Sequence, residues 1–306
     1  DKRRKAISIL YRQKYLFIMV IPAVILVFIF NYLPLWGWLM AFKNYSVGQN
    51  LWTSDWVGFK HFKTFFSAGD EYFYILRNTL VINIISIFLG MSTAMTFAIL
   101  LKELRSEFIA NAVQTVTFFP YFISYIIVYS IAYALLAVDS GAINQVLVSI
   151  GIRESGVNFL ADSRYSWPLV WTLGLWKNMG YNSVIYVASM SGIPQEQYES
   201  ASIDGAGRFQ KIYYITIPNL MGTVVVLLIL SVGNLLHSGL DFFFLFTNSL
   251  NWRTMEVLDM YVYRYGLQMG DFSYATAVGI LLTILSLILI FSANGLSKRY
   301  TGKYIL

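Results

Sequence analysis

Long uncharged stretches alternate with short charged segments along this chain of 306 residues. A helix that crosses the ~30 Å hydrocarbon layer of a bilayer needs ~20 mostly apolar residues. Six stretches reach that length with no charge or, in one case, a single charge, and they cover residues 15–42, 78–101, 108–138, 165–193, 220–240 and 272–296. The pattern predicts an all-α polytopic membrane protein with six transmembrane helices in a single transmembrane domain over residues 1–306.

Composition strengthens this prediction. Hydrophobic residues make up 57% of the chain and charged residues only 12%, about half of the ~25% typical of soluble domains. A soluble protein of this length would need more charge to cover its surface. The basic start, Lys2 to Lys5, precedes an apolar run that is too long for a signal peptide and lacks a small-residue cleavage site, so we expect a retained first helix.

The positions of the 22 Lys and Arg residues predict the orientation. If both termini lie on one side, that side holds 13 of them, the other side holds 8, and Lys177 lies within a span. Because Lys and Arg are enriched in cytoplasmic loops, both termini should be cytoplasmic. The net charge of +6 is then a signal of topology and does not indicate a nucleic-acid partner.

One predicted inner loop, residues 194–218, differs from the short connections elsewhere. Pro194 suits the first turn of a helix, because its missing N–H costs nothing there. The pair Asp204 and Gly205 then breaks the helix, since Gly tolerates positive φ. A second short helix should follow and end at Pro218, which begins the fifth span. The loop therefore predicts two short helices around a tight turn.

This loop resembles a known signature. Residues 199–201 (E-S-A), 204–206 (D-G-A) and 215–218 (I-T-I-P) are similar to the E-A-A…D-G-A…I-x-L-P pattern of permease subunits of bacterial type I ABC importers. The departures are conservative: Ser200, Ile212 and Ile217. Pro120 and the stretch 258–277 further resemble the branch that transports complex oligosaccharides, named for lipoprotein-associated sugar uptake. The resemblance covers nearly the whole chain and implies the MetI-like permease fold in the bacterial cytoplasmic membrane.

The resemblance also implies roles and partners. The loop would couple to the ATPase through the residues that match the signature: Glu199, Ala201, Asp204, Gly205, Ala206 and Pro218. The implied partners are a second, homologous permease subunit, two ATPase subunits that hold ATP and Mg²⁺, and an extracytoplasmic solute-binding protein. No cofactor is expected on this chain itself.

Other classes of function lack their residues. There is no G-x-x-x-x-G-K-[ST] phosphate loop, so ATP hydrolysis is not expected here, and the only histidines are His61 and His237. The chain contains no cysteine, which excludes disulfides and thiolate metal sites. A secondary transporter usually needs intramembrane carboxylates for its coupling ion, and no predicted span carries one. A membrane-embedded assembly protein would not need the signature loop.

The fourth predicted span carries the richest set of polar side chains. Intramembrane polar groups usually face the interior of a helix bundle, and aromatic rings and amides suit a sugar. The predicted substrate-pathway residues are Trp171, Trp176, Lys177, Asn178, Tyr181 and Asn182. Lys177 could pair with an acidic sugar, and the competing interpretation is that the amides join helices and the lysine snorkels. We expect an oligosaccharide substrate; a polyol or glycerol phosphate is the alternative.

Further polar residues leave two interpretations open. Polar side chains in and near the spans either join helices or contact the substrate: Asn83, Gln114, Asn234, His237 and Ser238. At the predicted outer mouth, solvated loop charges compete with binding-protein contacts at Asp241, Asp259 and Asp271.

Overall fold

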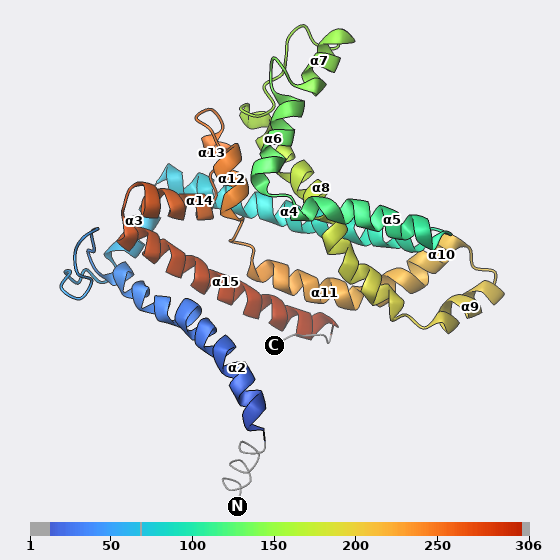
Figure 1. The fold of residues 1–306 in the computed structure, drawn as a ribbon, viewed down its shortest axis with the longest axis horizontal. Coiled ribbons are helices and arrows are strands. Elements are labelled where there is room, and N and C mark those ends of the chain that lie inside the picture. Colours follow the sequence, from blue (N-terminus) through green and yellow to red (C-terminus); the bar gives the residue numbers. More distant parts are fainter. Residues whose placement is uncertain (1–12, 68, 302–306) are drawn as a thin grey trace, which may run out of the picture. The chain divides into compact units, whose positions relative to one another are not determined.

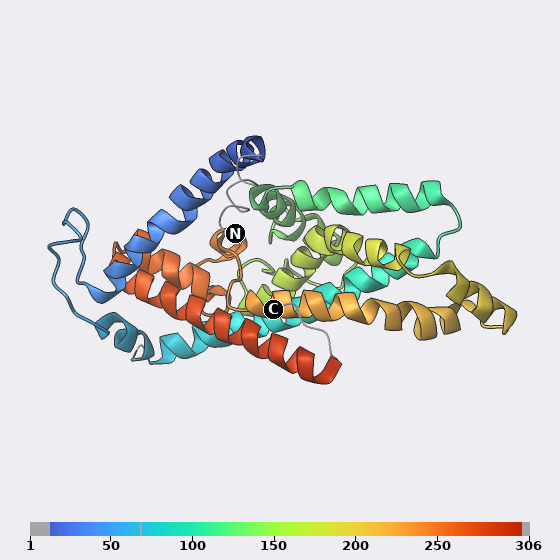
Figure 2. The ribbon, with the colours of Figure 1, turned by 90° about the horizontal axis from the view of Figure 1, so that it is seen from below.

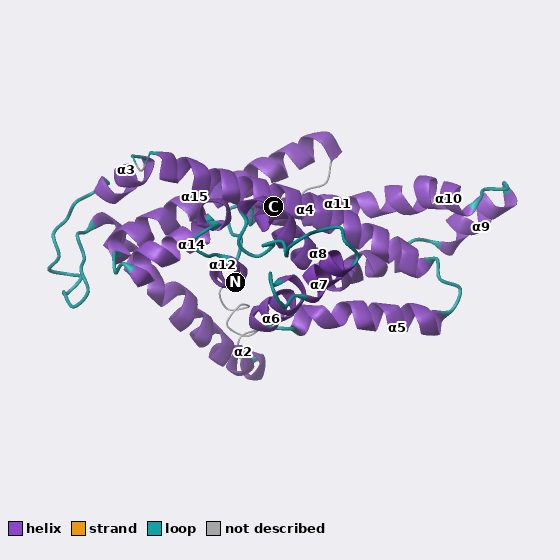
Figure 3. Ribbon diagram, turned by 90° about the horizontal axis from the view of Figure 1, so that it is seen from above, coloured by secondary structure: helices purple, strands orange, loops and turns teal. Residues whose placement is uncertain are grey.

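A computed structural model describes residues 13–67 and 69–301. The basic segment Lys2 to Lys5 lies outside the described residues. Within those ranges the chain is helix and loop, with no β-strand (Figure 3). The all-α class is therefore confirmed. The chain divides into two compact units, and the prediction of one transmembrane domain stays a prediction.

The first unit comprises Asp1–Ser67 and Arg264–Leu281. Its helical elements are α2 (Lys14–Val27), the π-helical turn η1 (Phe28–Tyr32), the 3₁₀ segment η2 (Leu33–Phe42), α3 (Lys60–Phe66), η5 (Arg264–Gln268) and the start of α15 (Phe272–Thr301). Ala41, Phe62, Ala277 and Ile280 form its small core. Ser273 Oγ accepts a 2.9 Å hydrogen bond from the backbone N–H of Tyr45 and so fastens the first loop to α15.

The second unit comprises Ala68–Tyr263 and Leu282–Leu306 and contains the candidate site. Its helical elements are α4 (Asp70–Lys102), α5 (Glu107–Phe118), η3 (Phe119–Phe122), α6 (Tyr125–Leu136), α7 (Ala142–Ser149), α8 (Ser163–Ser191), α9 (Gln195–Ile203), α10 (Arg208–Lys211), η4 (Ile212–Thr216), α11 (Ile217–Gly233), α12 (Leu240–Phe246), α13 (Trp252–Met255), α14 (Leu258–Tyr263) and the rest of α15. Figures 1 and 2 show α9 and α10 beyond the ends of α8 and α11.

Helix α8 packs against both α4 and α5 at the centre of this unit. Phe242, Phe243 and Phe246 of α12 fill the space beside α4, α6 and α8, where they are buried with apolar residues of those helices. Gly180 permits the close approach of α5, because a Cβ there would lie 2.2 Å from the carbonyl oxygen of Thr117. A small residue at a helix crossing is typical of membrane bundles, since their packing is van der Waals contact.

Four helical segments are long and apolar enough to span a membrane: Lys14–Phe42, Asp70–Lys102, Arg208–Gly233 and Phe272–Arg299. A fifth span results if the bent pair Glu107–Phe122 and Tyr125–Leu136 crosses as one. The remaining predicted span is α8, which has 29 residues but carries several polar side chains, among them Lys177. Of the six predicted spans, the described residues therefore support four, or five if the bent pair is counted as one span.

The third predicted span, residues 108–138, is not one straight helix. Its two halves, α5 with η3 and then α6, are bent by 103° (Figure 1). Ile123 and Ser124 between them are extended, with ψ of 132° and 153°. Pro120 lies in η3, where it lacks the N–H of an ordinary helical residue.

The helix in this region differs at both ends from the fifth predicted span, 220–240. Helix continues from Arg208 to Gly233, and Pro218 falls in the first turn of α11 without ending the preceding helix. The π-helical turn η4 directly precedes α11 and widens the helix where Pro218 cannot donate a hydrogen bond. After Gly233 the chain is irregular up to Gly239, whose φ is +81°.

Candidate functional site

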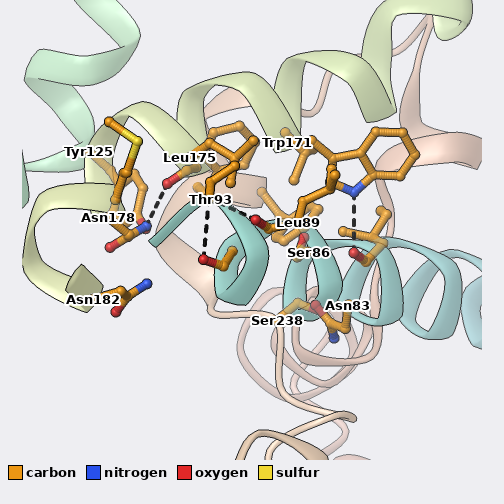
Figure 4. Close-up of a pocket in the computed structure, with 17 residues that line it drawn as sticks. Asn83, Ser86, Leu89, Thr93, Tyr125, Trp171, Leu175, Asn178, Asn182 and Ser238 are labelled. Carbon is orange, nitrogen blue, oxygen red and sulfur yellow. Dashed lines mark hydrogen bonds between the residues drawn. The ribbon is translucent and has the colours of Figure 1, made fainter. Parts of the chain in front are cut away.

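A cavity of about 220 Å³ lies between α4, α6 and α8 in the second unit (Figure 4). Its lining residues with a hydroxyl, amide or indole group are Asn83, Ser86 and Thr93 from α4, Tyr125 from α6, Trp171, Asn178 and Asn182 from α8, and Ser238 from the loop after α11. Apolar residues and two glycines complete the wall, and no charged side chain of the described residues lines the cavity. The cavity therefore offers hydroxyls, amides and aromatic surface to a ligand.

One face of α8 forms one side of this cavity. Trp171, Gly174, Asn178 and Asn182 recur at steps of three or four residues, which places them along a single helical face. Trp171 Nε1 donates to the carbonyl of Ile82 (3.2 Å) and so holds its ring across α4. Asn178 Nδ2 donates to Gly174 O (2.9 Å), and Asn182 has no hydrogen-bond partner among the described residues. The Asn182 amide is therefore free to bind a ligand.

The other three residues predicted for the pathway do not line the cavity. The side chain of Trp176 is 41% exposed and lies on another face of α8. Tyr181 stacks on Tyr121, with ring centroids 3.9 Å apart and an interplanar angle of 3°. Lys177 is buried, and its ammonium donates to backbone carbonyls of the third predicted span.

Among the lining residues that carry a hydroxyl or an amide, sequence reasoning missed three: Ser86, Thr93 and Tyr125. On α4, Asn83, Ser86 and Thr93 lie three and seven residues apart, so the polar positions already marked one helical face. Tyr125 carries no such signal, because its placement depends on the 103° bend that precedes α6.

The irregular segment after α11 is fastened from two sides. Asn83 Nδ2 donates to Leu235 O and Ser238 Oγ, each at 2.8 Å. Asp259 Oδ2 accepts from the backbone N–H groups of Ser238 (2.7 Å) and Gly239 (2.9 Å). Asp259 therefore acts as a clamp on the loop that brings Ser238 to the cavity.

The other polar candidates lie in several places. A second hollow of about 300 Å³ shares Asn83 and Ser86 with the cavity and is also lined by Asn234 and His237. Gln114 lies on α5 and lines neither hollow. Two further acidic residues were predicted for the outer mouth. Asp241 lies in the first turn of α12. Asp271 lies just before α15, and its Oδ1 accepts a hydrogen bond from Tyr274 N at 3.0 Å.

The predicted coupling loop contains the short helix α9, a turn at Gly205 and then α10, but α10 does not end at Pro218 as predicted, because it continues through η4 into α11. Gly205 has φ +79°, the left-handed conformation that Gly adopts without strain. Gly205 N donates to Ser202 O (3.1 Å) and Ala206 N donates to Ala201 O (2.8 Å). This pair of bonds is a Schellman motif and satisfies the last carbonyls of α9. Asp204 is the C-terminal cap residue of α9, so the run 204–206 specifies how the helix ends.

Side chains tie the turn to neighbouring helices. The hydroxyl oxygens of Tyr198 and Thr216 lie 3.0 Å apart and join α9 to η4. Arg208 donates to the Glu103 carboxylate and to its backbone carbonyl, both at 2.7 Å, and so joins α10 to the end of α4. The turn is therefore held as part of the second unit.

The coupling loop exposes both polar and apolar side chains. Glu199 is exposed, while Ile203 and Phe209 are 86% and 87% exposed. Large exposed apolar side chains beside a rigid turn are typical of a protein–protein contact.

A helical bundle with spans of this length, a polar cavity between them and an exposed rigid turn beyond their ends defines a polytopic membrane transport subunit. Comparison with known proteins identifies the family. Residues 86–302 match the family described as binding-protein-dependent transport system inner membrane component. The chain belongs to this family and is a permease subunit of an ABC importer, not an enzyme; ATP hydrolysis is the task of separate subunits.

Individual relatives agree with this assignment. The chain is 39% identical over 291 residues to protein LplB of Bacillus subtilis, covering 95% of this chain and 91% of LplB. It is 37% identical over 300 residues to the polygalacturonan/rhamnogalacturonan transport permease YteP of the same organism, covering 98% and 92%. A crystal structure of a bacterial ABC transporter that imports the acidic polysaccharide alginate matches with a TM-score of 0.89 at 32% identity, covering 97% of this chain and 99% of that one.

Proposed function

We propose that this chain imports an oligosaccharide across the bacterial cytoplasmic membrane by alternating access, as one of two homologous permease subunits. Two ATPase subunits would bind ATP and Mg²⁺ and dock on the coupling loop, and an extracytoplasmic solute-binding protein would deliver the sugar. ATP-driven closure of the ATPase pair would draw the coupling loops together and open the cavity outward. Relatives named for polygalacturonan, arabino-oligosaccharide and alginate transport support the substrate class.

The observation that carries the proposal is the chemistry of the cavity. Trp171 offers an aromatic face on which a sugar ring can stack, and Asn178 and Asn182 offer amides for its hydroxyls. A phosphate or carboxylate would favour charge-assisted bonds to Arg or Lys, and neither lines the cavity. The cavity therefore favours the hydroxyl-rich part of a sugar over glycerol phosphate, and a polyol remains the alternative.

Transport by the reconstituted complex tests this proposal. The complete importer in liposomes, with its binding protein, would be offered galacturonate, alginate and arabinose oligosaccharides, with a polyol as comparison. Replacing Asn182 by Ala removes an amide that no described residue occupies, so the KM for uptake should rise about 5- to 30-fold, the equivalent of one hydrogen bond of about 1–2 kcal/mol. Trp176→Phe, outside the cavity, is the matched control and should transport normally. Uptake of the polyol alone, or an unchanged KM for Asn182→Ala, would contradict the proposal.

We further propose that both termini and the coupling loop face the cytoplasm, as the distribution of Lys and Arg predicts. The absence of cysteine from the sequence permits single-cysteine labelling without a background. In intact cells a membrane-impermeant maleimide should label Glu154→Cys, in the predicted outer loop. Gln210→Cys, in α10, should react only after permeabilisation. The reverse pattern would overturn the orientation.

A further inference from the structure

Lys177 is a buried cation in the middle of α8, with only 6% of its surface exposed. Its Nζ donates to the carbonyl oxygens of Pro120 (3.2 Å), Tyr121 (2.8 Å) and Ile123 (2.5 Å). No carboxylate among the described residues forms an ion pair with it. The charge is therefore balanced by backbone dipoles. The three N–H donors of the ammonium match the three carbonyl acceptors.

These carbonyls lie where the third predicted span breaks. Pro120 and Tyr121 belong to η3, and Ile123 belongs to the extended link before α6 turns by 103°. The end of a helix leaves carbonyl groups without partners and carries a partial negative charge. In a membrane such groups need an internal partner, since lipid offers no hydrogen bond. The ammonium of Lys177 is that partner for Tyr121 and Ile123, and it is a second partner for Pro120, whose carbonyl also accepts from the backbone N–H of Ile123 at 3.2 Å. Its charge has the sign that a helix C-terminus favours.

The same contact borders the cavity. Tyr125 is the first residue of α6, it lines the cavity, and its ring centroid lies 5.1 Å from Lys177 Nζ. On the α8 side, Asn178 follows Lys177 directly and also lines the cavity. The position of Tyr125 relative to Asn178 therefore depends on how the break is held against α8.

We propose that Lys177 is a positioning residue, whose ammonium holds the broken span against α8 and so sets the cavity wall at Tyr125, and that it does not bind the substrate. The proposal rests on the proposed function only in taking this cavity as the transport cavity. An intramembrane lysine beside a sugar cavity otherwise suggests a ligand for a uronate carboxylate. The geometry points to the backbone instead, because all three donors of the ammonium are used.

Crosslinking tests the positioning role without any substrate. In this cysteine-free chain, Tyr121→Cys with Tyr181→Cys reports on the break, because the two native rings stack at 3.9 Å. Ser189→Cys with Thr223→Cys reports on the α8–α11 contact, where the native hydroxyl oxygens lie 2.7 Å apart. Lys177→Met keeps an unbranched side chain that is shorter by one atom, and removes the charge and the donors. With a short bifunctional thiol reagent, this change should lower crosslinking of the first pair about tenfold or more, and leave the second pair unchanged.

Transport then separates positioning from substrate binding. Lys177→Met should lower uptake of arabinose and galacturonate oligosaccharides by the same factor, whereas Trp176→Phe should leave both unchanged. Lys177→Arg retains the charge and the donors, and should recover part of the crosslinking. If Lys177→Met prevents insertion, Lys177→Gln, which keeps two N–H donors, undergoes the same measurements.

Two results would overturn the proposal: unchanged crosslinking of the first pair, or loss of galacturonate uptake alone with normal arabinose-oligosaccharide uptake. If the wild-type importer moves none of these sugars, the proposed function fails, and the crosslinking still decides the role of Lys177.

Discussion

Replacing Gly205 by Ala should uncouple the importer through the backbone alone. The residue has φ +79°, and a Cβ there would meet no described atom within 4 Å. The change therefore adds no clash, and its cost is the left-handed conformation, about 1–2 kcal/mol for a residue with a side chain. Stiffening of the unfolded chain does not offset this cost, because the native conformation is one that Ala avoids. The population of the intact Schellman turn, relative to other conformations of the loop, should therefore fall about 5- to 30-fold.

The assay is sugar uptake per ATP hydrolysed in liposomes, together with the affinity of the ATPase subunits for the permease. Gly205→Ala should weaken both, and Gly205→Asn should be milder, since Asn tolerates the left-handed region. Gly207→Ala is the matched control in the same loop: its φ is −70°, and the nearest atom to a Cβ, Gln210 Oε1, is 3.7 Å away. Equal losses for Gly205→Ala and Gly207→Ala, or normal coupling in Gly205→Ala, would refute the reasoning.

Three further outcomes follow from single contacts. Gly180→Ala should lower the free energy of unfolding by about 3 kcal/mol, measured by thermal unfolding in detergent, because the new Cβ would meet Thr117 O at 2.2 Å; unchanged thermal stability would contradict the observed packing. Asn144→Ala should expose residues 138–156 to protease, since the buried Asn144 donates to the carbonyls of Leu136 and Ala137 before this segment and of Val157 after it, whereas Gln145→Ala should not. Arg208→Ala should reduce uptake no more than about fivefold, because an exposed ion pair contributes about 1 kcal/mol or less; a larger loss would give Arg208 a direct role in docking.

The broad fold could be predicted because membrane insertion imposes a length and a composition on each span. The starts of α8 and α15 lie within two residues of the prediction for the same reason. The bend between α5 and α6 could not be predicted from composition, because residues 108–138 are uniformly uncharged and a hydropathy pattern does not register a break. Pro120 was visible in the sequence, but the carbonyls at the break accept hydrogen bonds from Lys177, which lies in a distant part of the chain.

The substrate pathway shows a similar division. All six predicted residues lie on one helix, and periodicity could have separated Trp171, Asn178 and Asn182 from Lys177 and Tyr181, because a helix turns 100° per residue. The cavity residues on other elements depend on tertiary contacts. Ser238 in particular reaches the cavity only because the helix ends at Gly233 and Asp259 clamps the following loop. The coupling turn was predictable because its bonds are local.

The cavity and the coupling turn are joined by the shortest covalent route available. Helix α8 carries Asn182 at the cavity and ends at Ser191, three residues before Pro194, the N-terminal cap of α9. Two hydroxyl pairs then bind the same region to the helix that runs from Arg208 to Gly233: Ser189 with Thr223 at 2.7 Å, and Tyr198 with Thr216 of η4 at 3.0 Å. A displacement of α9 by the proposed ATPase partner would therefore act on α8 and α11 together. Because α8 forms one wall of the cavity, movement of this pair changes the cavity directly, without a relay of side chains between the two sites.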